Sequence, residues 1–225
     1  MYTAITDFER PDPALIARAA KTYFLFLAAA AGPRQVMDSG IKPLVREWKI
    51  CGPAFTARAE HAEDVVTSYA ANFYAKPGDV IVVDAAGRTD VACYGASMAR
   101  GAKQAGAVGV VIDGCCESSN VIIDREKMPL FVRGTSPNII PQERPGWLNC
   151  PVICGRVIVN PGDIVCGDAD GVVVVPKVRA EEIIRSAEER GAPYQGPNSI
   201  VNMPFRQSHA DPVARYHKMP GITWR

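Results

Sequence analysis

Side chains able to do chemistry gather in two short segments of the chain. Segment 84–90 is Asp-Ala-Ala-Gly-Arg-Thr-Asp, and segment 113–118 is Asp-Gly-Cys-Cys-Glu-Ser. In such loops a carboxylate transfers protons or binds divalent cations, a guanidinium pairs with a substrate carboxylate, and a thiolate acts as a nucleophile. The two segments therefore indicate acid–base, metal or nucleophilic chemistry on a small acidic molecule.

Each segment follows a continuous apolar run. Val-Ile-Val-Val precedes Asp84, and Val-Gly-Val-Val-Ile precedes Asp113. Runs without polar alternation are typical of strands covered on both faces, and a helix is expected between them from near Tyr94. Loops that follow parallel strands meet at one edge of the sheet, where small molecules bind. The pattern therefore places both segments at one site.

The expected helix starts at Gly95, Ala96, Ser97 and Met98. The first backbone N–H groups of a helix have no partner within it, and the dipole is positive at this end. A carboxylate or phosphate can bind there through backbone geometry alone. These four residues are therefore the predicted substrate-binding element, whereas the side chains of Tyr94 and Met98 are expected in the core or the pocket wall.

Length and composition favour one cytoplasmic domain. The chain has 225 residues, 48% hydrophobic and 22% charged, enough for one core, and we expect a domain over 1–190 with an N-terminal helix at about 12–31. Residues 191–225 carry few aliphatic side chains and are expected to form an arm. A net charge of +1 gives no electrostatic footprint for nucleic acid, and no apolar run approaches the roughly 20 residues of a membrane span.

The seven cysteines also favour the cytoplasm. They are odd in number and lie mostly in apolar, strand-like segments, as reduced buried thiols do. The N-terminus lacks the basic and apolar regions of a signal peptide. We expect no structural zinc site, because no pair of Cys-x-x-Cys motifs is present.

The rest of the chain alternates helices and strands. Beyond the central unit we expect a strand at 52–58, a helix from about Glu63, and a strand at 129–133. Between 151 and 175, four short β-rich pieces are separated by turn sequences and predict hairpins, and a charged helix is expected over 178–190. The predicted class is α/β, with a central sheet flanked by helices.

Several motifs together resemble a known family. They are Gly-Pro-Ala-Phe-Thr at 52–56, Pro-Gly-Asp-Val-Ile-Val-Val-Asp at 77–84, the stretch from Tyr94 to Gly114, and Asn-Pro-Gly-Asp with Asp-Ala-Asp-Gly-Val-Val-Val-Val-Pro at 160–176. Over roughly residues 50–190 the chain resembles the RraA-like family. That family includes class II pyruvate aldolases acting on 4-hydroxy-4-methyl-2-oxoglutarate or 4-carboxy-4-hydroxy-2-oxoadipate.

The resemblance implies a fold and an assembly. Members have a swivelling β/β/α domain and form trimeric rings that often stack as hexamers, with active sites between subunits. In the aldolases, backbone amides of the helix start hold the pyruvate carboxylate, which corresponds to 95–98 here. An arginine then polarises the 2-oxo group, and the aspartate after it anchors a divalent metal.

This chain departs from the aldolase pattern at those last two positions. It has Glu117 where the arginine is expected and Ser118 where the metal ligand is expected. A carboxylate repels the negative charge that develops on an enolate, and serine is a weak ligand for Mg²⁺ or Mn²⁺. A cofactor therefore stays open, with Mg²⁺ or Mn²⁺ as candidates and Asp113 or Glu117 as ligands if one is bound.

Three hypotheses follow for function. The first is a lyase of the aldolase or decarboxylase kind acting on a small 2-oxo or carboxylated acid. The second is a metal-independent isomerase, tautomerase or hydratase that uses Glu117, and the third is a non-catalytic binding regulator of the RraA type. The expected partners are a small carboxylate substrate and further copies of the chain in a trimer or hexamer, without nucleic acid or membrane.

The candidate residues have competing structural roles. The predicted catalytic residues are Glu117, Arg88 and Asp90, and 95–98 are joined in substrate binding by Ser118 and Cys116. Glu117 could equally be a solvated loop carboxylate or an intersubunit ion pair. Arg88 and Asp90 could serve only local ion pairs, and the adjacent cysteines are more commonly buried structural thiols than nucleophiles.

Overall fold

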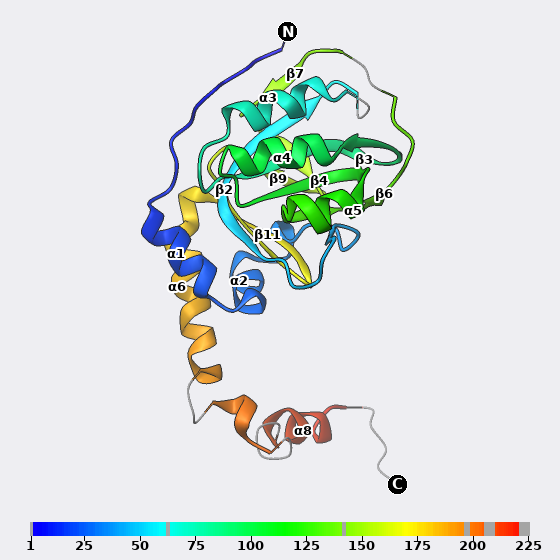
Figure 1. The fold of residues 1–225 in the computed structure, drawn as a ribbon. Helices are drawn as coiled ribbons and strands as arrows, with labels where there is room; N and C mark the ends of the chain where they lie inside the picture. The colour runs from blue at the N-terminus through cyan, green and yellow to red at the C-terminus, as the bar shows by residue number, and fades with distance from the viewer. Residues whose placement is uncertain (1, 62–63, 141–142, 196–198, 205–209, 221–225) are drawn as a thin grey trace.

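The fold is built around one large mixed sheet. The computed structural model describes residues 2–61, 64–140, 143–195, 199–204 and 210–220. Within them the strands run in the order β1-β5-β4-β3-β2-β10-β11 (Figure 1). Their bounds are Lys42–Pro43, Leu130–Val132, Gly109–Cys116, Val80–Tyr94, Ile50–Ala59, Ile164–Asp168 and Gly171–Val175. Two short strands join at the margins, β6 (Gly134–Thr135) beside β4 and β7 (Gly146–Leu148) beside β2.

The centre of the sheet is parallel and its flanks are antiparallel. β2, β3, β4 and β5 pair in parallel, whereas β10 pairs antiparallel with both β2 and β11. The central strands Val80–Val83 and Val110–Ile112 are buried on both faces, as their continuous apolar sequence predicts. The predicted α/β class with a central sheet flanked by helices is confirmed.

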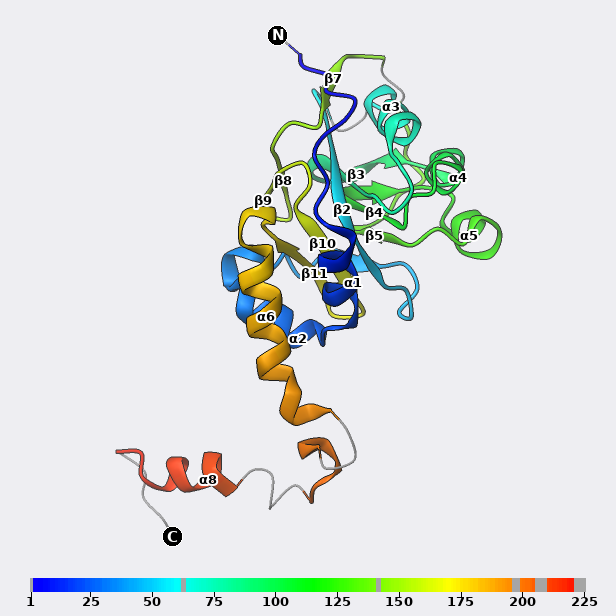
Figure 2. The same ribbon diagram turned by 90° about the vertical axis from the view of Figure 1, so that its left-hand side faces the viewer.

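Helices cover the sheet in two groups. α3 (Val66–Tyr74), α4 (Ala96–Gln104) and α5 (Ser119–Val121) lie over one face of the parallel strands (Figures 1 and 2). A second group packs where β10 and β11 form the edge; its members are α1 (Pro13–Lys21), α2 (Phe24–Ala31) and α6 (Ala180–Gly191). A single-turn π-helix, Ile122–Glu126, continues α5.

A hairpin covers the other face of the parallel strands. β8 (Val152–Cys154) and β9 (Val157–Val159) pair antiparallel, and their buried valines join the apolar core beneath β3 and β4 (Figure 2). Gly155 and Arg156 both have positive φ, 55° and 67°, which is the conformation of a two-residue type I′ turn. The predicted hairpins at 151–175 are confirmed, since β10 and β11 form the second one.

The prediction of one helix over 12–31 is wrong. Asp12 caps α1 by accepting a hydrogen bond from the N–H of Ala14 at 2.8 Å, but the chain bends by 116° between α1 and α2. Thr22 is extended (φ −75°, ψ 141°), and its hydroxyl donates to the carbonyl of Arg18 at 2.9 Å. A threonine hydroxyl that bonds the preceding turn competes with helix continuation, and the bend lets α2 pack on α6.

No single described helix is long and apolar enough to cross a membrane. The bent pair of α1 and α2 meets that test only when its two members are taken together, by length and composition. Leu27 and Ala31 of α2 are buried against the β10–β11 edge.

The expected turn at 85–90 is an irregular part of a strand. β3 runs from Val80 to Tyr94, with register shifts against β4 after Val83. Ala86 and Gly87 take positive φ values of 56° and 72°, which bends the strand outward before it rejoins β4. The prediction that the strand ends at Asp84 is therefore wrong, although the helix expected from near Gly95 is present as α4.

The C-terminal part continues beyond α6 and away from the sheet. Its described elements are the short 3-10 helices Ala192–Tyr194 and Ile200–Asn202 and the helix α8, Ala210–His217. α8 has no buried residue and lies apart from the sheet and its covering helices in both views (Figures 1 and 2). Whether 1–190 is an independent domain and 191–225 an arm stays a prediction.

Candidate functional site

The start of α4 is an uncapped helix N-terminus. Gly95 is the N-cap residue, and no side chain among the described residues accepts a hydrogen bond from the first turn. The N–H groups of Ala96, Ser97 and Met98 belong to the turn that has no acceptor within the helix. The helix dipole adds partial positive charge at the same place. The helix start expected at Gly95 is therefore present, and its binding of an anion stays a prediction.

Glu117 lies directly against this helix start. It follows β4, and its N–H donates to the carbonyl of Tyr94 at 2.9 Å, which joins the end of β4 to the residue before Gly95. Gly95 has no side chain, and a Cβ there would collide with the Glu117 carboxylate, whose carbon lies 2.9 Å from that position. Glycine at position 95 thus allows the carboxylate to reach the start of α4. The sequence predicted both residues for one site, and the fold brings them together.

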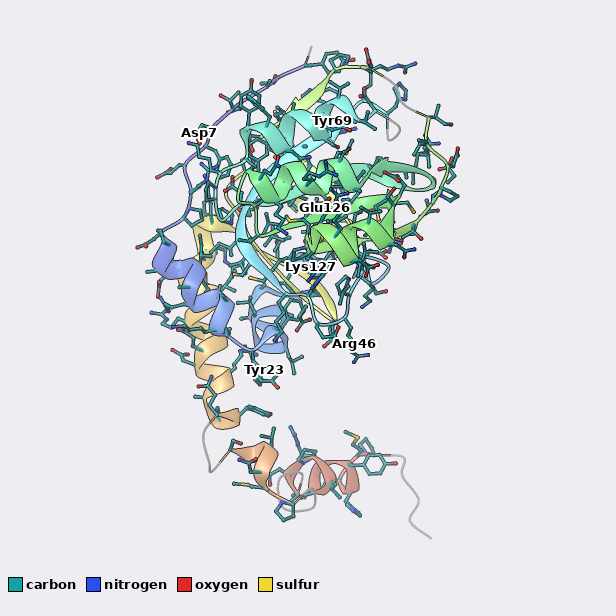
Figure 3. All side chains as sticks on the ribbon, in the orientation of Figure 1. Asp7, Tyr23, Arg46, Tyr69, Glu126 and Lys127 are labelled. Carbon is teal, nitrogen blue, oxygen red and sulfur yellow. The ribbon has the colours of Figure 1, made fainter. Side chains whose placement is uncertain are left out.

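Three hydroxyl groups lie at this corner. Ser118 donates a hydrogen bond to the Glu117 carboxylate, and the hydroxyls of Tyr69 and Ser97 are 2.8 Å apart. Tyr69 comes from α3, beside α4 in Figure 3, and its side chain is half exposed. Ser118 takes a φ of 52°, uncommon for a residue with a side chain. Backbone strain of this kind is concentrated at functional sites.

Arg88 and Asp90 pair with each other in the bent part of β3. The Nε of Arg88 donates to one Asp90 oxygen at 2.9 Å, and its Nη2 lies 2.6 Å from the other. Both side chains are exposed to solvent, at 38% and 66%. The carbonyl of Asp90 accepts a hydrogen bond from Asn138 at 2.8 Å. The pair therefore places a partly exposed guanidinium with a carboxylate beside it in the bent part of β3.

Asp113 is part of a different network. One of its oxygens accepts from the Nε of Arg133, and the other accepts from the N–H of Gly155 at 2.9 Å. Arg133 also contacts Asp38 at 3.2 Å, and Arg156 lies 3.3 Å from the second oxygen of Asp38. Asp113 and Asp84 are both largely buried under the hairpin of β8 and β9. This network holds the hairpin and the 38–41 loop against the sheet.

The remaining predicted site residues lie in the core. Cys116 is fully buried, and burial raises the pKa of its thiol to about 12. The Met98 side chain is buried as well, as expected, so Met98 offers the site only its backbone. The Tyr94 hydroxyl donates to Asn72 at 2.9 Å, and burial raises the pKa of Tyr94 well above its usual value. Cys116 therefore presents no surface for the predicted substrate contact.

Asp113 and Glu117, the predicted metal ligands, are not arranged to bind a divalent metal ion. Both oxygens of Asp113 are already bound, by a guanidinium and by a backbone N–H. Glu117 is left as a carboxylate beside the helix start, with a serine as its neighbour, whereas Mg²⁺ and Mn²⁺ take several oxygen ligands. Among the described residues no group of three or more His, Cys, Asp or Glu side chains is placed to hold a metal.

The sequence did not single out three polar residues whose contacts are visible only in the structure. Tyr69 lies in the helix expected from about Glu63, and its spacing there does not indicate that its hydroxyl reaches Ser97. Arg133 and Asn138 follow the strand β5, and neither was a candidate site residue. A basic residue directly after a buried strand, as in Leu-Phe-Val-Arg, was the signal available for Arg133.

Comparison with known proteins agrees with this architecture. Residues 17–174 match the family model described as RraA-like, Aldolase/RraA. A protein of Halalkalibacterium halodurans named "Putative 4-hydroxy-4-methyl-2-oxoglutarate aldolase" is 35% identical over 156 residues, which cover 69% of this chain and 73% of that protein. The chain is therefore a member of the RraA-like family, and the predicted resemblance is confirmed.

Solved structures carry the same fold. The Streptomyces coelicolor protein RraAS2, described as an unusual member of the RNase ES inhibitor RraA protein family, superposes with a TM-score of 0.72 at 30% identity, over 83% of this chain and 96% of its own. A Geobacillus kaustophilus protein described as an S-adenosylmethionine:2-dimethylmenaquinone methyltransferase has a TM-score of 0.57 at 31% identity, over 63% of this chain and 86% of its own. The predicted RraA-like fold is confirmed.

Proposed function

We propose that this protein is a lyase of the aldolase or decarboxylase kind that acts on a small 2-oxo or carboxylated acid. The observation that carries the proposal is the uncapped start of α4 with the carboxylate of Glu117 beside it. The start of α4 binds the substrate carboxylate, and Glu117 transfers a proton from or to the bound substrate. The aldolase name of the Halalkalibacterium relative supports the same class.

The roles follow from the chemistry of each group. The N–H groups of 96–98 hold the substrate carboxylate, and Glu117 takes the proton from the substrate hydroxyl. The carbon–carbon bond then breaks, and its electron pair moves toward the 2-oxo oxygen as an enolate. Arg88 is the cation proposed to balance that charge, because its partner Asp90 is exposed and can be replaced by the substrate. Protonation of the enolate carbon by the Glu117 carboxylic acid completes the cycle.

An altered site is part of the proposal. Glu117 is negative next to a seat for anions, so the substrate carboxylate and the ionised Glu117 repel each other. Ser118 offers no carboxylate to a divalent metal at the position where the aldolases have aspartate. We expect the reaction to run with a lower requirement for added metal than an aldolase that keeps arginine and aspartate at these positions.

The direct test is release of pyruvate from 4-hydroxy-4-methyl-2-oxoglutarate and from oxaloacetate. Each substrate is incubated with the full-length protein in Mg²⁺, in Mn²⁺ and in EDTA, and pyruvate is measured with a coupled dehydrogenase. We expect release from at least one substrate that persists in EDTA. Loss of all activity in EDTA would contradict the metal-independent form, and no release under any condition would contradict the lyase proposal.

A second candidate is proton transfer without bond cleavage. The proximity of Glu117 to Gly95 favours an isomerase, tautomerase or hydratase equally well, because these reactions need the same anion seat and the same base. Exchange of the C3 protons of 2-oxo acids in D₂O, followed by NMR, distinguishes the two. Exchange without pyruvate release supports this candidate, and release supports the lyase.

A third candidate is binding without catalysis. The description of the Streptomyces relative as part of an RNase ES inhibitor family favours it. It is tested by adding the purified protein to a nuclease of the RNase E type and following cleavage of a model RNA. Inhibition at a stoichiometric ratio with no turnover of 2-oxo acids would replace the enzymatic proposal.

We also propose a cytoplasmic homo-oligomer, a trimer or hexamer. The apolar side chains of Val66, Tyr69, Phe73 and Tyr74 are exposed along α3, and Phe73 is 80% exposed, which is costly unless another subunit covers it. The seven cysteines are free thiols, as in a reducing compartment. Light scattering after gel filtration tests the assembly, and a monomeric mass would contradict it.

A further inference from the structure

A pair of thiols lies in contact at the boundary between the parallel strands and the β10–β11 hairpin. The sulfur atoms of Cys51 and Cys166 are 3.3 Å apart, and their strands β2 and β10 place them directly opposite each other. Cys51 is partly exposed, whereas Cys166 is buried. The other five cysteines show no such sulfur–sulfur contact among the described residues.

The strand register shows that this pair can be bridged. Pro53 opposes Ile164 and has no N–H, so that position is a non-hydrogen-bonded one. Hydrogen-bonded and non-hydrogen-bonded pairs alternate along antiparallel strands, and Cys51 and Cys166, two residues further along, are therefore of the same kind. The Cα atoms of such pairs are about 4.5 Å apart, which lies within the range for disulfides. The two sulfurs need to approach by only about 1 Å to bond.

A cavity gives small molecules access to the pair. A cavity of about 750 Å³ lies between the α1–α2 bend and strands β2 and β10, and both thiols line it. Its wall includes the side chains of Lys21 and Lys49, and Tyr23 stands at the bend, where Figure 3 labels it. The lining contains none of the residues of the α4 corner, so the cavity is separate from the proposed active site.

The two thiols are chemically unequal. A hydrogen bond from the Cys166 thiol lowers the pKa of Cys51. The same contact and burial raise the pKa of Cys166 well above its usual value. Because the thiolate is the reactive form, the partly exposed Cys51 reacts first with an oxidant that enters the cavity. Burial raises the pKa of Cys93 and Cys116 to about 12, and these thiols stay inert.

We propose that Cys51 and Cys166 form a reversible, oxidant-driven disulfide that joins β2 to β10. Cys51 attacks the O–O bond of a hydroperoxide and becomes a sulfenic acid, while the peroxide is reduced to an alcohol or to water. Cys166 then attacks the sulfenic sulfur, the S–S bond forms, and a second water leaves. Two thiols lose two electrons in all, and a dithiol reductant restores them.

The disulfide is expected to stabilise the folded protein, because it links two parts of the structure. β2 belongs to the parallel sheet that carries the proposed site, and β10 belongs to the edge against which α1, α2 and α6 pack. A bond between positions 51 and 166 closes a loop of roughly 115 residues, which constrains the unfolded chain strongly. Oxidation is expected to raise the midpoint of thermal unfolding by roughly 5 °C or more, and reduction to reverse it.

The experiment uses the full-length protein, reduced, desalted and treated with hydrogen peroxide. The protein is then unfolded in urea, its free thiols are blocked with N-ethylmaleimide, and it is analysed by intact mass and by digestion under non-reducing conditions. We expect two of the seven thiols to become inaccessible, one linked peptide containing Cys51 and Cys166, and full recovery in dithiothreitol. A linked peptide with another partner, or a sulfinic acid at Cys51 with Cys166 still reduced, would overturn the proposal.

Variants separate the two steps. Cys166→Ser removes the resolving thiol, so a sulfenic acid at Cys51 should accumulate and be trapped by dimedone. Cys150→Ser removes another partly exposed thiol outside the pair and is the matched control, in which the disulfide should form as in the unaltered protein. Loss of the disulfide in the control, or equal dimedone labelling of the unaltered protein and Cys166→Ser, would contradict the assignment. These readouts need no enzymatic activity, so they are independent of the proposed function.

Discussion

Asp113 and Glu117 are four residues apart at the end of β4, and the structure gives them opposite surroundings. Asp113 accepts hydrogen bonds from Arg133 and from the N–H of Gly155 beneath the hairpin. Glu117 has the hydroxyl of Ser118 and the start of α4 beside it, and it forms no ion pair with the described residues. A carboxylate bound on both oxygens stabilises the fold, whereas one that faces an uncapped helix start remains available for chemistry.

The difference arises because Asp113 lies within β4, whereas Glu117 follows its last residue. Successive residues of a strand point to opposite faces, and β4 carries Asp113 into the layer filled by β8 and β9. Glu117 lies beyond the end of β4, where the chain turns toward α4. The fold thus assigns a structural role to one carboxylate and an exposed corner to the other.

The largest expected effect is the loss of stability in Asp113→Asn. The substitution leaves Arg133 without its buried anionic partner and is expected to lower the free energy of unfolding by about 3 kcal/mol. Urea unfolding followed by circular dichroism measures it. The matched control is Glu182→Gln, which breaks the exposed pair with Arg179 and should leave the free energy of unfolding nearly unchanged. Equal effects in the two variants would mean that Asp113 has no special structural role.

Glu117→Gln should separate activity from stability. We expect turnover, in whichever of the proposed reactions is found, to fall by about 100-fold or more, because a general base is lost. The midpoint of urea unfolding should stay close to that of the unaltered protein, since Glu117 has a single hydroxyl partner. Retained turnover would remove Glu117 from the mechanism. A large loss of stability would mean that Glu117, like Asp113, has a structural role.

The smallest expected effect is on the pH dependence of stability. It involves Asp38, which contacts Arg133 in the same network as Asp113. The N–H of Gly40, followed by Arg133 and Arg156, lowers the pKa of Asp38. A carboxylate with a lowered pKa stabilises the folded protein above its unfolded pKa, near 4, and this contribution disappears as the pH falls through the folded value. Asp38→Asn should therefore flatten the loss of stability between about pH 5 and pH 2. An unchanged acid limb in urea unfolding would contradict this.

Much of the fold could be predicted because local sequence and tertiary structure agree. The apolar runs at 80–83 and 109–112 are buried strands, and Asp12 with Pro13 begins α1 as expected. The irregular course of β3 was missed because Gly87 and its neighbours resemble an ordinary turn. Only pairing with β4 on the far side of the bulge keeps residues 91–94 in the sheet.

The bend between α1 and α2 was missed for a related reason. The apolar pattern from Leu15 to Leu27 is continuous, so periodicity alone predicts one helix. The two halves pack differently, α1 mainly against β2 and α6, and α2 mainly against α6 and β11. Contacts between elements distant in sequence therefore decided where the helix had to break.

The family, the α/β class and the strands of the sheet could be predicted from the sequence alone. So could the two residues, Gly95 and Glu117, that lie together at the start of α4. These features depend on apolar runs, turn residues and motif spacing, which are local properties of the chain. The partners of each charged or thiol group were decided by tertiary structure. Asp113 pairs with Arg133, Tyr69 contacts Ser97, and Cys51 contacts Cys166. These contacts exist because folding brings together residues up to 115 positions apart. Side-chain chemistry is written in the sequence, but whether a group stabilises the fold or remains available to react depends on the neighbours that folding supplies.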